Sequence, residues 1–359
     1  MLTTKLRNIN AKILPKKQFF GPEWLILGVN NVCNLHCKMC DVGTQFEGSN
    51  FYVNLVGTRP LNMPEELIFN VIDQAAHYYP NVKLGYAFTE PLVYKHLIES
   101  LEYADSKNLF TSITTNALTL KKDAGALCKA GLNELFVSLD GPADVHNEIR
   151  GHKSSFEKAI AGIEAVLEHN KRPDISIFCV VTEWNIGRLK EFADYFKKVP
   201  LKQLGYMHTN YTPDEVADVH NKTYGKEYPA TASNMEEIDI SKMDLDVLFE
   251  EIEQIRKSDY DFPVTFSPEI KERRKLEEFY LHPEKIIGRM CNDVFRNIMI
   301  KSDGSVIPAH GRCYNLTIGN LYDQNLKEIW HSAKLADFRK TLMDAGGLLP
   351  ACSRCCSAF

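Results

Sequence analysis

Short apolar segments alternate with amphipathic segments from residue 24 to about residue 210, and this alternation constrains the fold more than any other feature of the sequence. Apolar segments rich in Val, Ile, Leu, Phe or Tyr predict strands: Trp24–Val29, Val82–Tyr86, Phe110–Thr114, Glu134–Leu139, Ile175–Val181 and Gln203–His208. The amphipathic segments between them predict helices: Pro64–Tyr79, Tyr94–Lys107, Leu120–Ala130, Ser155–Asn170 and Asn185–Lys198. Because strands and helices alternate, the sequence predicts βαβ units and an α/β fold with a parallel sheet.

The number of predicted units limits how far the sheet can close. Six units are too few for a closed eight-fold barrel, so residues 24–210 predict a partial, open TIM-like (β/α)6 barrel. Residues 1–23 form an N-terminal extension, and the charged, helical residues 211–290 predict a linker or lid region. Residues 291–359 predict a small C-terminal domain. Its predicted elements are a hairpin, Asn297–Lys301 and Ser305–Pro308 around Ser302-Asp303-Gly304, and a helix over Leu326–Met343.

Composition excludes several classes of protein. The chain has 359 residues and a net charge of -5, which argues against a nucleic-acid partner. It contains no run of about 18 apolar residues, so we expect no membrane-spanning segment and no membrane partner. The basic N-terminus lacks the apolar core of a signal peptide, which predicts a cytoplasmic protein. In that reducing compartment the ten cysteines are expected to be metal ligands or redox groups rather than disulfides.

Three of these cysteines follow the first predicted strand directly, in the segment Cys33-Asn34-Leu35-His36-Cys37-Lys38-Met39-Cys40. Three thiolates in so short a loop can converge on one metal centre. A four-iron cluster normally takes four thiolates, so three protein ligands leave one iron open to a small molecule. The alternative is a structural zinc site, for which His36 lies inside the segment as a possible fourth ligand.

This C-x3-C-x2-C spacing resembles that of the radical S-adenosylmethionine (SAM) enzymes, although Met39 stands where the family usually has an aromatic residue. The resemblance implies that Cys33, Cys37 and Cys40 hold a [4Fe-4S] cluster that binds SAM. It implies reductive cleavage of SAM to a 5′-deoxyadenosyl radical, which abstracts a hydrogen atom from the substrate. A flavodoxin- or ferredoxin-type protein would then supply the electron.

Further segments at predicted strand ends resemble the SAM-binding parts of that family. Tyr86–Leu92 resembles its Gly-Gly-Glu-Pro segment, with Phe88-Thr89 in place of the glycines, and implies that Glu90 accepts a hydrogen bond from the SAM ammonium. Thr89 would line the same contact. The alternative for Glu90 is a solvated carboxylate that caps a helix.

Two more strand ends complete this predicted site. Asn116 follows the third strand and is either a ribose contact or a turn residue. Ser138, in Val137–Gly141, and Arg150, in an Ile-Arg-Gly segment, are expected to contact the SAM carboxylate, for which a guanidinium offers a bidentate grip. The alternative for Arg150 is a surface ion pair.

A second cysteine group occupies the C-terminal domain: Cys291, Cys313, Cys352, Cys355 and Cys356. Two pairs of thiolates also fit zinc, but the stretch from Cys291 to Trp330 resembles the auxiliary-cluster extension of the family, called SPASM or twitch. The resemblance implies one auxiliary [4Fe-4S] cluster on Cys291, Cys313, Cys352 and Cys355. Because Ala309 stands where the family often has a cysteine, Cys313 is the preferred second ligand and His310 a possible substitute. Cys356 is then either a spare thiol or a hydrogen donor to a substrate radical.

The expected substrate is a small molecule. Only 23 residues precede the first predicted strand, which leaves no room for a peptide-recognition domain. We therefore expect a sugar, aminocyclitol or nucleotide sugar that is dehydrogenated or epimerised by an oxidoreductase or epimerase-type enzyme. A strand-end group, Tyr206, His208, Asn210 and Tyr211, would bind its hydroxyls or would pack the strand end. The alternatives are a peptide-modifying maturase and a non-catalytic zinc or iron–sulfur protein.

Overall fold

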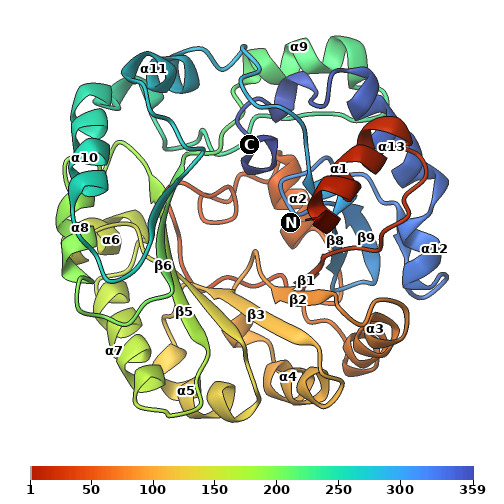
Figure 1. Cartoon of the computed structure of the whole chain (residues 1–359), viewed down its shortest axis with the longest axis horizontal. Coiled ribbons are helices and arrows are strands. Elements are labelled where there is room, and N and C mark those ends of the chain that lie inside the picture. The colour runs from red at the N-terminus through yellow and green to blue at the C-terminus, as the bar shows by residue number, and fades with distance from the viewer. Residues whose placement is uncertain (1) are drawn as a thin grey trace.

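The computed structural model describes residues 2–359, which form a ring of helices around one twisted sheet (Figure 1). The sheet has ten strands in the order β10-β9-β8-β1-β2-β3-β4-β5-β6-β7. They are β1 (Trp24–Gly28), β2 (Lys83–Tyr86), β3 (Phe110–Thr115), β4 (Glu134–Ser138), β5 (Asp174–Val181), β6 (Gln203–His208), β7 (Val264–Ser267), β8 (Asn297–Lys301), β9 (Ser305–Pro308) and β10 (Gly319–Asn320). This confirms the α/β class and the parallel sheet.

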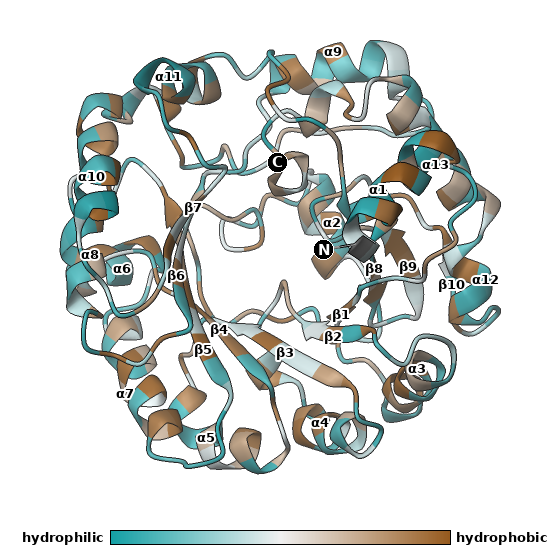
Figure 2. Cartoon of the chain, in the orientation of Figure 1, coloured by the Kyte–Doolittle hydropathy of each residue, from teal (hydrophilic) through white to brown (hydrophobic). Residues whose placement is uncertain are grey.

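Most helices surround the sheet on its outside, while α2 (Asn50–Val56) lies within the ring and α1 (Leu2–Ile13) toward the viewer (Figure 2). The other helices are α3 (Glu65–Tyr78), α4 (Leu97–Ser106), α5 (Leu120–Lys129), α6 (Ala143–Ile149), α7 (Ser155–Leu167), α8 (Leu189–Tyr195), α9 (Asp214–Tyr224), α10 (Leu245–Lys257), α11 (Arg273–Leu281), α12 (Leu326–Trp330) and α13 (Ala333–Asp344). One large apolar core lies between the sheet and this layer. None of the described helices is long and apolar enough to cross a membrane.

The parallel part of the sheet is longer than the six strands that the sequence predicts. β7 adds to β6 in parallel, and it arises from the region read as a linker or lid. β8, the first strand of the predicted hairpin, pairs in parallel with β1, so the C-terminal segment extends the barrel sheet instead of standing apart from it. The strand order still ends at β7 and β10, so the barrel is open, as expected.

The single C-terminal helix predicted over Leu326–Met343 is instead two helices, α12 and α13. Ser332 breaks it, because its hydroxyl accepts a hydrogen bond from the amide of Leu335 at 3.4 Å and so caps a new helix. The α12 start is fixed in the same way by a capping box between Asn325 and Glu328.

Candidate functional site

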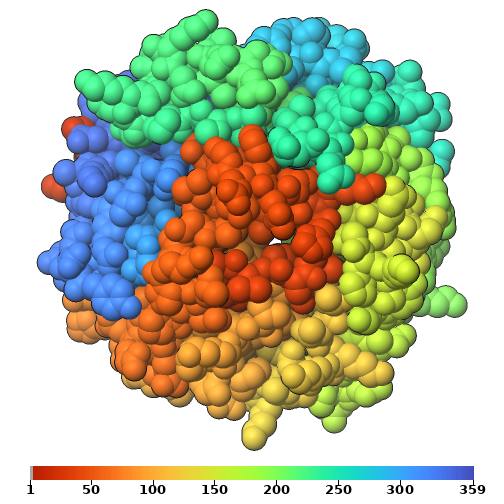
Figure 3. Space-filling view, turned by 180° about the vertical axis from the view of Figure 1, so that it is seen from behind, coloured from red at the N-terminus to blue at the C-terminus, as the bar shows by residue number. Residues whose placement is uncertain are grey.

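The loop that carries Cys33, Cys37 and Cys40 leaves the carboxyl end of β1 and folds back on itself. A side chain at Gly43 would collide with the backbone of Cys37, so glycine allows the loop to close there. Asp41 fixes the loop from the other side, because it accepts hydrogen bonds from the Asn234 amide at 2.6 Å and the Ser233 hydroxyl at 2.7 Å. The face seen in Figure 3 presents this part of the chain in orange-red, beside a narrow opening.

The three thiols share one electrostatic environment. Burial raises the pKa of Cys37 to about 12, and Arg150 partly opposes this shift while Cys40 and Cys33 add to it. Burial also raises the pKa of Cys33, with a smaller upward contribution from Cys40. Thiolates so close together in a buried loop are unfavourable unless a cation joins them, which fits a bound metal cluster.

Arg150 lies directly against this group. Its Nη1 is 3.5 Å from the sulfur of Cys37, and its Nε donates to Asp140 Oδ2 at 2.5 Å. The side chain of Asp140 is fully buried, and its other oxygen accepts from the Val180 amide at 2.9 Å. The sequence identified Arg150 but not its partner, although Asp140 belongs to the quoted segment Val137–Gly141. The structure therefore places Arg150 as a buried cation beside the cysteines rather than as a surface ion pair.

Glu90 is only 1% exposed and is held by three donors. Oε1 accepts from the Thr115 hydroxyl at 2.6 Å and the Leu92 amide at 3.0 Å, and Oε2 accepts from the Asn116 amide at 2.8 Å. Burial raises the pKa of Glu90, and these three donors oppose that shift. An ionised carboxylate has room for about four hydrogen bonds, so one position on Oε2 remains for an ammonium group.

The three other residues predicted to contact SAM are Thr89, Asn116 and Ser138, and they differ in the hydrogen bonds that they make within the protein. The Thr89 hydroxyl donates to the side chain of Asn30 at 2.7 Å, which in turn donates to the Glu90 carbonyl at 2.9 Å. Asn116 accepts from the Leu118 amide at 3.0 Å, as a turn residue does, and its side-chain amide donates to Asn34 of the cysteine segment at 2.7 Å, so a ribose contact stays a prediction. Ser138 is partly exposed at the end of β4, and within residues 2–359 its hydroxyl has no hydrogen-bond partner.

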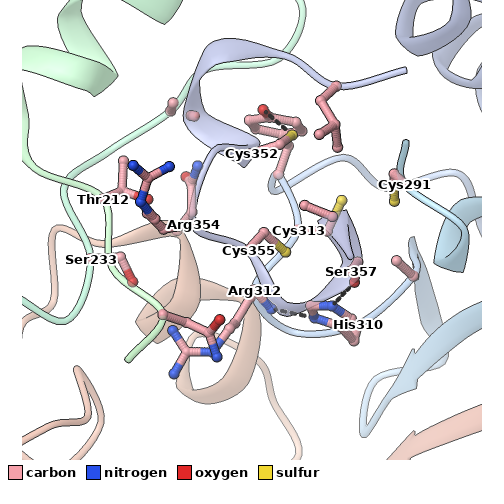
Figure 4. A pocket seen from close by; sticks show the side chains of 18 of the residues that line it. Thr212, Ser233, Cys291, His310, Arg312, Cys313, Cys352, Arg354, Cys355 and Ser357 are labelled. Carbon is pink, nitrogen blue, oxygen red and sulfur yellow. Dashed lines mark hydrogen bonds between the residues drawn. The ribbon is translucent and has the colours of Figure 1, made fainter. Parts of the chain in front are cut away.

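The C-terminal cysteines gather in a second pocket. Figure 4 shows Cys291, Cys313, Cys352 and Cys355 around its interior, although 64 positions separate the first from the last. Burial raises the pKa of Cys291, and the neighbouring thiols Cys355, Cys313 and Cys352 raise it further. The Tyr314 hydroxyl lies 3.2 Å from the Cys352 sulfur. Four thiols around one pocket, of which that of Cys291 is buried and the other three are half-buried, fit a closed metal cluster.

Cys356 does not line that pocket and is exposed. Its sulfur lies 3.7 Å from Nε2 of His310, which is buried. The ligand atoms of His310, Cys355 and Cys356 lie within 4.8 Å of one another. The histidine therefore has a position from which it can replace a cysteine ligand, as the sequence allowed. Cys356 is absent from the pocket lining but adjoins Cys355, so which of these two cysteines is the fourth ligand stays a prediction.

The two cysteine groups are connected by packing. The ring of His310 stacks on Phe88 with centroids 5.7 Å apart, and Phe88 directly precedes Thr89 and Glu90. A Cβ at Gly311 would lie 3.2 Å from the Phe88 ring. The predicted SAM site and the second pocket therefore share a wall.

Side chains of the predicted strand-end group at and after the end of β6 make hydrogen bonds to neighbouring elements of the protein. Tyr206 donates to the Leu189 carbonyl at 2.6 Å, and His208 lies 2.8 Å from the Tyr280 hydroxyl. Tyr211 donates to the Tyr280 carbonyl at 2.7 Å. These three side chains are buried, which fits the packing alternative, but Asn210 and Tyr211 also line the pocket of the C-terminal cysteines, so a substrate contact there stays a prediction. Sequence reasoning missed Tyr280 because it lies in the region read as a linker or lid.

Arg354, between Cys352 and Cys355, is a further residue that the sequence did not reveal. Its buried guanidinium donates to five backbone carbonyls, those of Glu278, Phe279, His282, Lys285 and Ser353. Several of these belong to the last turn of α11, where a cation is favourable. Arg354 therefore holds the cysteine turn against α11. Its position between the two cysteines was the only sequence signal for this role.

Comparisons with known proteins agree with both halves of the site. A family model described as the Radical SAM superfamily matches residues 28–196. A second, SPASM, described as an iron–sulfur cluster-binding domain, matches residues 291–356. The two matches include both cysteine groups and confirm the resemblance seen in the sequence.

Curated relatives match only in part. The chain is 24% identical over 196 residues to a cysteine-type anaerobic sulfatase-maturating enzyme of Clostridium novyi, covering 51% of this chain and 50% of the relative. It is 30% identical over 182 residues to a probable GTP 3′,8-cyclase of Methanococcus aeolicus, covering 49% of this chain and 56% of the relative. The chain thus spans about half the length of these curated relatives.

The fold matches a solved structure more fully. Streptococcus suis SuiB bound to precursor peptide SuiA superposes with a TM-score of 0.63 and 18% identity, covering 93% of this chain and 70% of the other. This match establishes the fold. Together with the two family matches it supports a [4Fe-4S] cluster with SAM and an auxiliary cluster, and the buried thiol groups have the chemistry that both clusters require.

Proposed function

Because the chain belongs to the radical SAM superfamily and carries a C-terminal SPASM domain, we propose that it modifies a side chain of a peptide or protein by radical chemistry. This replaces the sugar-like substrate that the sequence led us to expect. The relatives reported above include a sulfatase-maturating enzyme and a protein crystallised with a precursor peptide, and neither is named for a sugar. Peptide modification was the alternative in the sequence reading.

The open side of the barrel carries the geometric argument for a chain-like substrate. β7 pairs with β6 only, so its other edge is free to meet an extended backbone. Directly beyond β7 lies a groove of 870 Å³ between α11 and the chain's last residues, with Pro268 and Phe359 in its walls. Ala358, next to Phe359, lines the pocket of the C-terminal cysteines. A peptide in this groove would therefore lie next to the second cysteine group.

Within this proposal each residue group has a distinct task. Cys33, Cys37 and Cys40 would hold the cluster, which with SAM supplies the hydrogen-abstracting radical. Arg150, fixed by Asp140, provides positive charge beside the cysteines and toward a SAM carboxylate. Glu90 keeps one acceptor position for the SAM ammonium, and Thr89 and Asn30 hold the loop that positions it. Ser138 contributes a free hydroxyl at the end of β4.

The second group determines what becomes of the substrate radical. Cys291, Cys313, Cys352 and Cys355 would hold the auxiliary cluster, which can accept an electron from the substrate and so complete an oxidation. Cys356, exposed and outside that pocket, would instead return a hydrogen atom from its thiol. A flavodoxin- or ferredoxin-type protein in a reducing cytoplasm would supply the electron for SAM cleavage.

The test is anaerobic reconstitution followed by incubation with SAM, dithionite and either a peptide library or a panel of sugars and nucleotide sugars. We expect peptides to raise 5′-deoxyadenosine formation and to change in mass, while the sugars leave both unchanged. Turnover of sugars without turnover of any peptide would contradict the proposal. In deuterated water, deuterium in the product identifies return of hydrogen from a thiol, and a loss of two hydrogens without deuterium identifies oxidation.

A further inference from the structure

Helix α1 exposes an apolar face that no part of the described chain covers. Leu6, Ile9 and Ile13 are 44%, 52% and 69% exposed, and their i, i+3, i+7 spacing places them in one stripe. Leu14 and Phe19, which follow directly, are also exposed, at 45% and 63%. Single exposed apolar side chains are ordinary, but five within 14 positions form a patch.

The opposite face of α1 is fixed to the body of the protein, so the apolar stripe cannot turn inward. Ala11 is buried in the apolar cluster that contains Phe338. Arg7 pairs with Glu23, the residue before β1, at 2.9 Å, and Arg296 donates to the Asn8 side chain at 3.3 Å. The helix is therefore held with one face outward.

Charge is distributed very unevenly between this segment and the rest of the chain. The first 22 residues hold five of the 42 lysines and arginines and none of the 47 acidic residues, so the remainder has a net charge of about -10. Lys5, Lys12, Lys16 and Lys17 are all exposed. Lys16 pairs with Asp337, and Lys17 lies over the ring of Phe19 at 5.6 Å.

The position of α1 keeps the candidate active site free. The segment leads into the amino end of β1, whereas the cysteine loop leaves its carboxyl end. Figure 1 shows α1 toward the viewer, and Figure 3, from behind, shows the cysteine loop on the opposite face. A partner bound to α1 would not cover that loop.

We propose that α1 and the turn to Phe19 form a docking surface for an anionic membrane. A basic helix with a narrow apolar stripe lies in the plane of a membrane, with its apolar side chains at the boundary of headgroups and acyl chains. Lysines beside the stripe attract anionic headgroups, and an aromatic residue such as Phe19 adds an anchor at that depth. The acidic remainder is repelled by the same surface, so the protein binds in one orientation. This proposal departs from the expectation that the chain has no membrane partner, which was drawn from the lack of a spanning segment; a contact on the surface needs no such segment.

The choice of a membrane over an acidic protein partner follows from the shape of the patch. Its apolar side chains run along the outside of one convex helix, and the pockets found in the structure lie elsewhere. A flat, deformable surface covers such a stripe without a complementary groove. A single short helix predicts reversible rather than permanent binding.

The experiment is vesicle flotation of the full chain, with vesicles of phosphatidylcholine alone or with about 30% phosphatidylserine. We expect binding to the anionic vesicles only, weakened about tenfold by Ile9→Ser with Ile13→Ser, and also by Lys5→Glu with Lys12→Glu or by high salt. The matched control is Val219→Ser with Lys222→Glu on the exposed face of α9, which should leave binding unchanged.

Three outcomes would overturn the proposal: no binding by the unaltered chain, equal binding to both vesicle types, or equal weakening by the α9 control. Formation of 5′-deoxyadenosine without vesicles should be the same in all variants, because the altered side chains are exposed, whereas the face of α1 that packs near Cys291 through Ala11 is unchanged. The proposed peptide chemistry and this docking surface are therefore tested separately.

Discussion

Replacing Arg354 with methionine tests whether the turn between Cys352 and Cys355 depends on its attachment to α11. Methionine keeps much of the apolar volume but removes every donor. The guanidinium now donates to the carbonyls of Lys285 and Ser353 at 2.9 Å, of Glu278 at 2.8 Å and of His282 at 2.6 Å, as well as to that of Phe279.

The expected loss can be worked out from these acceptors. The carbonyl of Phe279 also accepts from the Tyr211 hydroxyl, and that of His282 accepts from the Lys285 amide, so these two keep a partner. The carbonyls of Lys285 and Ser353 accept no other hydrogen bond within residues 2–359. Two acceptors left unsatisfied, of which that of Ser353 is buried and that of Lys285 partly buried, at ~1–3 kcal/mol each give a loss of at most roughly 2–6 kcal/mol in the free energy of unfolding. Much of this loss falls on the cysteine turn itself.

The assay is iron and sulfide counting after anaerobic reconstitution, together with thermal unfolding. We expect Arg354→Met to lose about four irons, those of one cluster, and to keep SAM cleavage. Arg312→Met is the matched control, because Arg312 lines the same pocket and lies 4.4 Å from the Phe51 ring, but its side chain donates no hydrogen bond to the described chain. A full iron count and an unchanged unfolding temperature in Arg354→Met would refute the reasoning.

The remaining predictions concern the cysteines and Glu90. Cys37→Ala should abolish 5′-deoxyadenosine formation, and continued formation would show that the ligand assignment is wrong. Cys352→Ala should lower the iron count by roughly half if the two clusters are alike. An unchanged count would contradict the assignment of an auxiliary cluster to the C-terminal cysteines. Cys356→Ala should leave iron intact, and a loss of about four irons would make Cys356 a ligand. Glu90→Gln should weaken SAM binding about tenfold to a hundredfold, measured by titration with SAM, because it replaces one acceptor oxygen with a donor; unchanged affinity would assign Glu90 to the loop alone.

The sequence predicted best those elements that carry their own periodic signal. β6 and both strands of the hairpin have the predicted bounds, because apolar residues and a Ser-Asp-Gly turn mark them locally. β7 was missed because it has only four residues and Thr265 and Ser267 are exposed, so it lacks an apolar run. The cysteines were recognised by their spacing alone.

Contacts between distant segments account for what sequence reasoning did not find. Asp140 belongs to a recognised segment, but its pairing with Arg150 depends on how α6 turns after β4. Arg354 finds its carbonyls about 70 residues earlier in the chain, across a region predicted only as helical. Any residue can offer a backbone carbonyl as an acceptor, so the residue types near α11 do not reveal this contact. The arginine itself could not be assigned a partner from the sequence.

Two departures from the family pattern, Phe88 and Ala309, have one structural explanation. Both residues adopt positive φ, 85° and 55°, a region that glycine enters at little cost and that a bulky residue enters only under constraint. The constraint at Phe88 is its ring, which stacks on His310, the residue after Ala309. Strain of order 1–3 kcal/mol per position is thus partly offset by an aromatic contact, worth about 0.5–1.5 kcal/mol, that joins the Glu90 loop to the loop carrying Cys313. A glycine at position 88 would relieve the strain but lose this contact, and the pairing of β1 with β8 and the Asn54 hydrogen bonds to Gly311 and Cys313 would then carry the connection alone.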